Sequence, residues 1–142
     1  MSDDVFTPLQ KWGITAIRVV VGVVFLMHGG QKLFIWGFSG VAAFLGQLGI
    51  PAPMLASIIV TLVEFLGGLA LFLGLFTRWV AILLAIDMAV AILTVHLPNG
   101  FFLPEGFEYP LTLLAANVSL ALLGSGEASV DRFLEKQSAR GG

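Results

Sequence analysis

The sequence predicts an all-α fold, an integral membrane four-helix bundle that forms a single domain over residues 1–142. Apolar residues make up 58% of the chain, charged residues only 11%, and the mean hydropathy is +0.99. About 25% of the residues of a soluble domain are charged, so seven basic and nine acidic side chains cannot cover a water-soluble surface. Four apolar segments also have about the 20-residue length that crosses a bilayer. A soluble enzyme is therefore excluded, and the lipid bilayer is the first expected partner.

The composition excludes further classes of function. The chain has no cysteine, so it cannot form a disulfide, a catalytic thiolate, a cysteine-ligated zinc site or an iron–sulfur cluster by itself. Its net charge of −2 leaves no basic surplus, and we expect no nucleic-acid partner. No phosphate loop, nucleophile elbow, dinucleotide fingerprint or paired metal motif occurs. The sequence therefore encodes no recognisable metal or flavin site.

The first apolar segment runs from about residue 12 to residue 34. Five side chains recur on one stripe at spacings of 4, 3, 4 and 3 residues, which holds them within about 40° of one another on a helix. They are Arg18, Gly22, Phe25, Gly29 and Lys32, with His28 beside the stripe. The acidic residues 1–4 and the lack of a small-residue cleavage site after Met27 argue against a signal peptide. We expect this segment to be retained as a span.

The second segment, about residues 52–74, has Glu64 as its only charged side chain. At 1.5 Å per residue, Glu64 lies about 16 Å from the outer end of the span, near the middle of the membrane. Its helix face also carries Ser57, Thr61, Gly68 and Leu71. The pair Gly67 and Gly68 predicts close approach of another helix backbone.

The third segment, about residues 78–97, carries Asp87 near mid-depth. A stripe of small residues, Ala81, Ala85 and Ala89, suits contact with a neighbouring helix. The fourth segment, about residues 109–123, is short for a span and carries Asn117. A thinned bilayer boundary would complete it.

Basic residues predict the orientation of the bundle. If the N-terminus is in the cytoplasm, six of the seven basic residues lie on the cytoplasmic side or in the cytoplasmic half of the bilayer: Lys11, Arg18, Arg78, Arg132, Lys136 and Arg140. Lys32 alone lies toward the outer side. This asymmetry predicts a multi-pass protein of the bacterial inner (cytoplasmic) membrane with both termini in the cytoplasm. The polar tail, residues 125–142, is expected to form a short amphipathic helix and a frayed end.

The two outer connections, about residues 35–51 and 98–109, are rich in aromatic side chains. Two interpretations stay open for them. They form an aromatic belt at the membrane interface, or they fold back as a lid over an outward-facing pocket.

Three ionisable side chains inside the spans need a partner or a purpose, because each costs about 2.5–3.5 kcal/mol to insert. Arg18, Glu64 and Asp87 are the candidate catalytic residues. One fixed cation against two carboxylates leaves a buried negative charge unless one carboxyl is protonated or Lys32 reaches inward. The alternative is a structural network of Arg18, Glu64 and Asp87 that fixes the register of the helices.

A second polar cluster is expected at the outer ends of the first and third spans. Its members are His28, Gln31, Lys32, His96, Asn99, Glu105, Glu108 and Tyr109. Lys32 could pair with Glu108. His96 lies nine residues after Asp87, about 180° around an α-helix, so the two can face one pocket only if the helix bends or ends near Pro98. Two histidines could in principle ligate haem, copper or zinc, but two ligands do not complete a metal site. A hydrogen bond from a histidine to a ligand oxygen, or a place at the interface, is the alternative.

In their order along the chain, these motifs resemble the DoxX family of small bacterial membrane proteins. The resemblance covers about residues 13–124 and rests on Arg18-x3-Gly22-x2-Phe25-x2-His28-Gly29-x2-Lys32, Glu64-x2-Gly67-Gly68-x2-Leu71-x2-Gly74, Arg78, Asp87, His96-x-Pro98-Asn99-Gly100-Phe101-Phe102 and Glu108-Tyr109-Pro110. It implies a four-helix membrane protein with basic and acidic residues inside the bundle. Some members are subunits of a thiosulfate:quinone oxidoreductase, and others are linked to dismutase and sulfurtransferase complexes or to resistance against quinones and catechols.

The leading functional hypothesis is a quinone- or quinol-binding subunit of a membrane oxidoreductase or detoxification complex. A quinone ring needs hydrogen-bond donors, a proton route and apolar walls. Lys32, His28 and His96 are the candidate donors, Glu64 and Glu108 the proton relays, and Phe25, Phe102 and Tyr109 the walls. Because no redox centre is encoded, electrons would come from a protein redox partner.

The alternative is non-enzymatic: an assembly factor, or a protein that binds a small apolar molecule or a partner's membrane helix. The absence of a complete catalytic constellation favours this alternative. A transporter is a third class, against which four spans without an inverted repeat argue. Homo-oligomerisation would weaken that argument and stays open.

Overall fold

The computed structural model describes residues 5–141, and all the secondary-structure elements in this range are helices. The acidic N-terminal residues 1–4, on which the expectation of a retained first span partly rests, lie outside the described residues. The α-helices are α1 (Pro8–Gln31), α2 (Gly37–Gln47), α3 (Pro53–Leu73), α4 (Thr77–Ala91), α5 (Glu108–Leu123) and α6 (Val130–Gly141). The π-helix η2 (Lys32–Trp36) follows α1, and the π-helix η3 (Ile92–His96) and the 3₁₀ turn η4 (Leu97–Asn99) follow α4.

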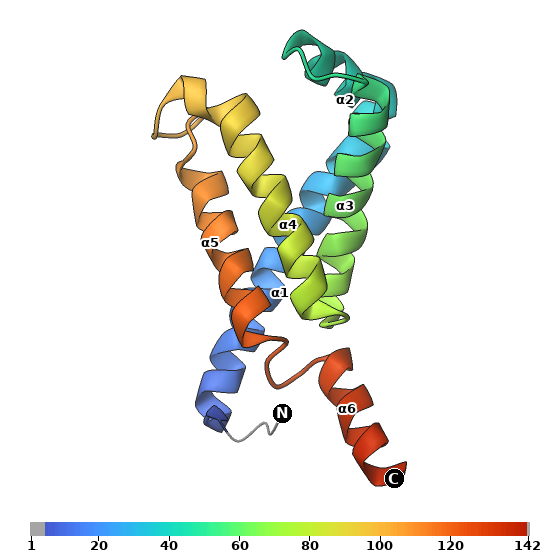
Figure 1. The fold of residues 1–142 in the computed structure, drawn as a ribbon, viewed down its shortest axis with the longest axis vertical. Helices are drawn as coiled ribbons and strands as arrows, with labels where there is room; N and C mark the ends of the chain where they lie inside the picture. Colours follow the sequence, from blue (N-terminus) through green and yellow to red (C-terminus); the bar gives the residue numbers. More distant parts are fainter. Residues whose placement is uncertain (1–4, 142) are drawn as a thin grey trace.

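Four apolar helical stretches give the molecule the predicted membrane architecture. Within residues 5–141, three are long enough to cross a bilayer, Pro8–Gln47, Pro53–Leu73 and Thr77–Asn99, and Glu108–Leu123 is shorter. The start of α1 and the C-terminal helix α6 lie at one end of the bundle, which we call the tail end, and α2 lies at the opposite, pocket end (Figure 1). The cytoplasmic location of the tail end stays a prediction.

The spans are arranged as two helix pairs. Helix α1 packs along α3, and α4 packs along α5. The connection between α3 and α4 is short, so the two helices meet at the tail end and diverge toward the pocket end (Figure 1). The core contains Phe25, Leu71, Leu84 and Leu120. Because α3 and α4 diverge, the α1–α3 pair and the α4–α5 pair separate toward the pocket end.

Glycines allow the backbones of α1 and α3 to touch, as their spacing predicted. A Cβ atom on Gly22 would clash with the backbone of Phe72, one on Gly29 with Phe65, and one on Gly68 with Leu26. The predicted interior face of α3 is also confirmed, because Ser57, Thr61, Glu64, Gly68 and Leu71 are its buried residues. The glycines fix the distance between the helices and the register in which they run.

Gly68→Ala should destabilise the protein by about 2 kcal/mol, because overpacked sites cost about 1–3 kcal/mol. Its neighbour offers a matched control, since a Cβ on Gly67 would meet only the flexible side chain of Leu84, at 3.3 Å. Gly67→Ala should change stability by less than about 1 kcal/mol, because alanine is the better helix former. Thermal unfolding followed by circular dichroism in detergent measures both. Equal losses in the two variants would contradict the proposed backbone contact.

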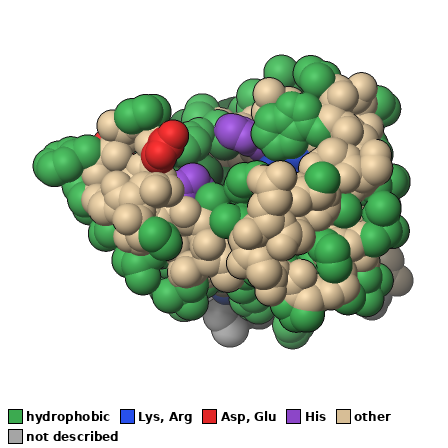
Figure 2. Space-filling view, turned by 90° about the horizontal axis from the view of Figure 1, so that it is seen from above, with side chains coloured by type: hydrophobic (Ala, Val, Ile, Leu, Met, Phe, Trp, Pro, Cys, Tyr) green, Lys and Arg blue, Asp and Glu red, His purple; other side chains and the backbone are tan. Residues whose placement is uncertain are grey.

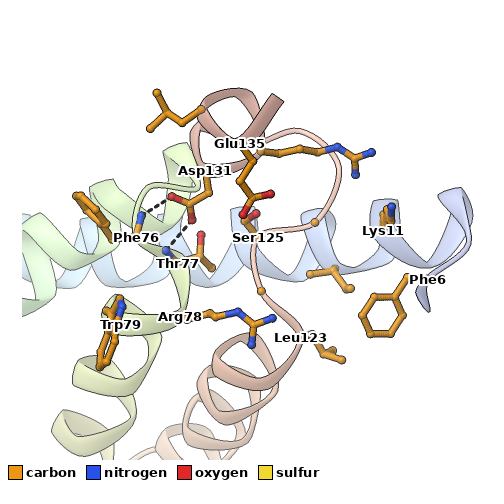
Figure 3. A pocket seen from close by; sticks show the side chains of 15 residues that line it. Phe6, Lys11, Phe76, Thr77, Arg78, Trp79, Leu123, Ser125, Asp131 and Glu135 are labelled. Atoms are coloured by element: carbon orange, nitrogen blue, oxygen red, sulfur yellow. Dashed lines mark hydrogen bonds between the residues drawn. The ribbon is translucent and has the colours of Figure 1, made fainter. Parts of the chain in front are cut away.

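The segment after α5 closes the tail end and begins the predicted tail helix. The Asp131 carboxylate accepts hydrogen bonds from the backbone N–H groups of Phe76 (2.7 Å) and Thr77 (2.9 Å) at the start of α4 (Figure 3). A negative charge at a helix N-terminus is favourable. Nearby, Arg78 donates to the carbonyl oxygens of Ala121 and Leu122 at the end of α5. Charged side chains thus cap two helices at this end.

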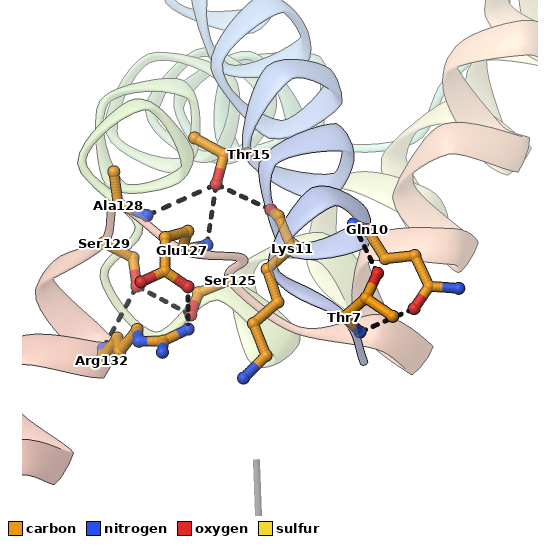
Figure 4. Close-up of polar contacts among 9 residues, drawn as sticks. All are labelled: Thr7, Gln10, Lys11, Thr15, Ser125, Glu127, Ala128, Ser129 and Arg132. Carbon is orange, nitrogen blue, oxygen red and sulfur yellow. Dashed lines mark hydrogen bonds and ion pairs between the residues drawn. The ribbon is translucent and has the colours of Figure 1, made fainter. Parts of the chain in front are cut away.

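The same segment is tied to α1. The Thr15 hydroxyl accepts hydrogen bonds from the backbone N–H groups of Glu127 (2.9 Å) and Ala128 (3.4 Å) and donates to the carbonyl oxygen of Lys11 (Figure 4). Glu127 also forms an ion pair with Arg132. Helix α1 itself begins with a capping box of Thr7 and Gln10. These contacts join the first helix to the chain that leads into α6.

Candidate functional site

A cavity of about 740 Å³ lies between the two helix pairs at the pocket end. This size is typical of small-molecule sites, about 300–1,000 Å³. Seen from this end, the surface is hollowed and histidine side chains border the hollow (Figure 2). The walls are mainly aliphatic and aromatic. Of the predicted site residues, the cavity is lined by Phe25, His28, Lys32, Glu64, Asp87, His96 and Tyr109.

An ion pair lies at the polar centre of the cavity. Lys32 Nζ is 2.5 Å from Glu64 Oε2, and the side chains are 18% and 6% exposed. Glu64 is held there by α3, whose close contact with α1 at Gly29 brings Lys32 to the same depth. The sequence left two ways to compensate the negative charge of the buried carboxylates, a protonated carboxyl group or an inward-reaching Lys32. The structure shows that Lys32 reaches inward.

Asp87 completes this cluster from α4. It lies within electrostatic reach of both Glu64 and Lys32. Its Oδ2 atom is buried and accepts no hydrogen bond from a donor among residues 5–141, although the Asp87 carboxyl group lies within hydrogen-bonding reach of the Glu64 carboxyl group. A buried oxygen without a partner costs about 1–3 kcal/mol. The cluster therefore offers a bound molecule one unused hydrogen-bonding position beside an ion pair.

The π-helix η3 explains how His96 and Asp87 line the same cavity. On a continuous α-helix the two residues would lie on opposite faces, but the wider π turn reduces the rotation between them. The sequence required the helix to bend or end near Pro98 if both residues were to face one pocket, and the change from α-helix to π-helix at Ile92 meets this requirement. His96 Nδ1 lies 2.9 Å from the backbone oxygen of Glu105, which fixes the imidazole against the 98–109 connection.

Three predicted site residues lie elsewhere. The alternative of a structural network that joins Arg18 to Glu64 and Asp87 is wrong, because Arg18 donates to the carbonyl oxygens of Leu71 (2.5 Å), Phe72 (2.7 Å) and Ala128 (2.5 Å) near the tail end. The pairing of Lys32 with Glu108 is also wrong.

Glu108 instead accepts a hydrogen bond from the backbone N–H of Leu103, at 2.7 Å. Phe102 is 77% exposed and is not part of the cavity lining. Glu108 thus orders the connection beside the cavity, and the Phe102 ring faces outward.

Both aromatic connections contribute residues to the cavity lining, and the choice between a belt and a lid stays open. Trp36, Phe44 and Leu45 line the cavity from η2 and α2, and Leu103 and Pro104 from the other connection. Sequence reasoning noticed the aromatic content of these segments but did not assign these residues to a site. Thr94, which lines the cavity from η3, was also missed, although a regular α-helix would place it on the same face as Asp87, seven residues earlier.

A second hollow of about 350 Å³ lies at the tail end (Figure 3). Its polar groups include Asp131 and Arg78. Both already cap helices. The cavity at the pocket end is therefore the candidate functional site.

Comparison with known proteins places this geometry in a family. The DoxX family model matches residues 13–97. The chain is 35% identical over 129 residues to the Bacillus subtilis protein named "Putative oxidoreductase CatD", which covers 91% of this chain and 92% of that protein. It is 33% identical over 134 residues to the inner membrane protein YqjF of Escherichia coli, with 91% and 97% covered.

A membrane protein of Mycobacterium tuberculosis is 35% identical over 136 residues, with 88% of this chain and 83% of that protein covered. No solved structure matches the chain significantly. The family match includes the first three spans and with them Lys32, Glu64 and Asp87. The chain belongs to the DoxX family of membrane proteins.

Proposed function

We propose that this protein is the quinone- or quinol-binding subunit of an oxidoreductase in the bacterial inner membrane. The observation that carries the proposal is the ion pair of Lys32 and Glu64, with the unpartnered Asp87 Oδ2 beside it, inside an apolar cavity. A small apolar ring that carries two oxygens matches this distribution of groups. The relative from Bacillus subtilis carries the name "Putative oxidoreductase CatD", which is consistent with this chemistry.

Different residues of the cavity lining would bind the polar and the apolar parts of such a ring. Lys32, His28 and Tyr109 supply N–H and O–H donors, and Glu64 and Asp87 supply carboxylates that hold or release a proton. His96 donates its Nδ1–H to the backbone oxygen of Glu105, so its neutral imidazole offers Nε2 as an acceptor for a quinol hydroxyl. Phe25 and Trp36 supply flat apolar walls. A bound quinone would supply the exchange of two electrons and two protons, and the electrons would come from a partner protein.

Glu64→Gln should test the proposal directly. We expect it to weaken saturable binding of a benzoquinone, or quinone-dependent turnover with the partner, at least tenfold, because the ion-pair partner of Lys32 and one of the two proton-exchanging carboxylates are removed. Titration of purified protein in lipid nanodiscs measures the binding. Glu135→Gln, on the exposed face of α6, is the matched control. Unchanged binding in a folded Glu64→Gln protein would reject the role of Glu64.

A non-enzymatic binding or assembly protein is the second candidate, favoured by the lack of any encoded redox centre in the sequence. Purification from native membranes separates the two. Co-purified quinone with a saturable response supports the oxidoreductase subunit. A stoichiometric protein partner with no bound quinone supports the assembly factor.

A further inference from the structure

The two lateral sides of the cavity differ in polarity. Between α1 and α5 the lining includes His28 and Tyr109. Between α3 and α4 it is aliphatic, with Ile59, Val60, Val63, Leu83, Ile86 and Val90. The α3–α4 side thus offers aliphatic side chains from the cavity to the surface that faces lipid.

The residues on the α3–α4 side belong to the cavity and to the outer surface at once. Ile59 is 54% exposed, Leu83 54%, Ile86 57% and Val90 50%, yet all four line the cavity. These helices meet at their short connection and diverge toward the pocket end (Figure 1). The cavity therefore opens sideways, at a depth where the bilayer supplies hydrocarbon rather than water.

The polar cluster adjoins this opening. Asp87 is the residue after Ile86 on α4, and Leu83, Ile86, Asp87 and Val90 share one helix face. On α3, Glu64 lies five residues from Ile59, about 7.5 Å along the helix axis. A ring held at the cluster would thus have an aliphatic channel beginning beside it and ending at the lipid.

We propose that the cavity accepts an amphiphile whose polar ring lies at Lys32, Glu64 and Asp87 and whose long alkyl or isoprenoid tail leaves between α3 and α4 into the bilayer. The inference rests on the proposed function and adds the class of ligand and its route. Hydrogen-bonding groups select the ring, and the aliphatic side selects the tail. A tail in this gap also leaves the side with His28 and Tyr109 free for protons and water.

The test compares two probes, a dimethoxy-methyl-benzoquinone with no tail and the same ring with a decyl tail. Ile86→Trp and, independently, Val90→Trp place a large ring in the gap. Each should weaken binding of the decyl compound at least tenfold more than it weakens binding of the tail-less compound. Leu93→Trp is the control, because Leu93 on η3 is also exposed, at 67%, but does not line the cavity.

Each outcome has a distinct meaning once all variants show the unmodified unfolding temperature. If both gap variants bind the two compounds as the unmodified protein does, or lose both equally, the α3–α4 route is overturned. If the unmodified protein binds neither compound saturably, the proposed quinone function fails and this inference fails with it. Selective loss of the tailed compound supports both.

Discussion

Arg18→Met is expected to lower the free energy of unfolding by at least about 3 kcal/mol, because hydrogen bonds to a charged donor contribute about 1.5–3 kcal/mol each. Arg18 is 1% exposed and donates to three carbonyl oxygens. Two of these belong to Leu71 and Phe72 at the end of α3, where a positive charge also interacts favourably with the helix dipole. Methionine fills a similar volume but leaves all three oxygens without their donor.

Two further variants make the measurement specific. Arg18→Lys keeps the charge but lacks the guanidinium fork that reaches α3 and Ala128 together, so an intermediate loss is expected. Arg140→Met removes an exposed cation near the end of α6 and should change stability by less than about 0.5 kcal/mol. Thermal unfolding in detergent reports all three. If Arg18→Met unfolds like the unmodified protein but loses quinone binding, a functional role for Arg18 is restored and its structural role is rejected.

Helix faces were predictable from residue spacing. The stripe of Gly22, Phe25 and Gly29 faces α3, and the face of α3 that carries Glu64 and Gly68 is buried. Spacing succeeds here because a helix in a bundle has one interior side, and small or polar residues in an otherwise apolar span mark that side. The fold class and the interior position of the key carboxylate followed from the same pattern.

The partners of the buried charges were not predictable in the same way. Facing residues on two antiparallel helices depend on their register, and a shift by one turn keeps the same faces in contact. In the observed register Gly22 lies against Phe72 and Gly29 against Phe65. Lys32 is thereby brought to Glu64, whereas Arg18 lies at the end of α3.

Local backbone changes account for the other differences. Two π-helices, η2 and η3, follow α1 and α4 at the pocket end. They turn Trp36 and His96 into the cavity lining. Such segments are rare and often occur at functional sites, but a regular period of 3.6 residues cannot reveal them. The residues that line the cavity from α2 were missed for a related reason, since the segment after the first span was expected to be a connection rather than a helix.

Combining Glu64→Gln with Asp87→Asn is expected to cost more stability than the two single changes together. Each single variant leaves Lys32 one neighbouring carboxylate, because both acids lie within its electrostatic reach. We expect each single loss to be about 1 kcal/mol. The double variant leaves a mostly buried ammonium group with no counter-charge in the cluster, and removing the partner of a buried charge costs about 3–5 kcal/mol. The difference is the coupling energy of the pair, and groups in one network typically couple by about 0.5–3 kcal/mol.

A triple variant supplies the control, because Lys32→Met added to the double change removes the uncompensated charge and should recover most of the lost stability. Unfolding in detergent measures the stability, and quinone binding measures the site in the same samples. The triple variant should be stable but unable to bind, because a cavity without its charged cluster has lost the groups that hold the ring. Additive single losses, or a triple variant no more stable than the double, would show that the three side chains do not act as one unit. The cluster would then be three separate polar groups, and the site would have to be sought among the residues of the connections.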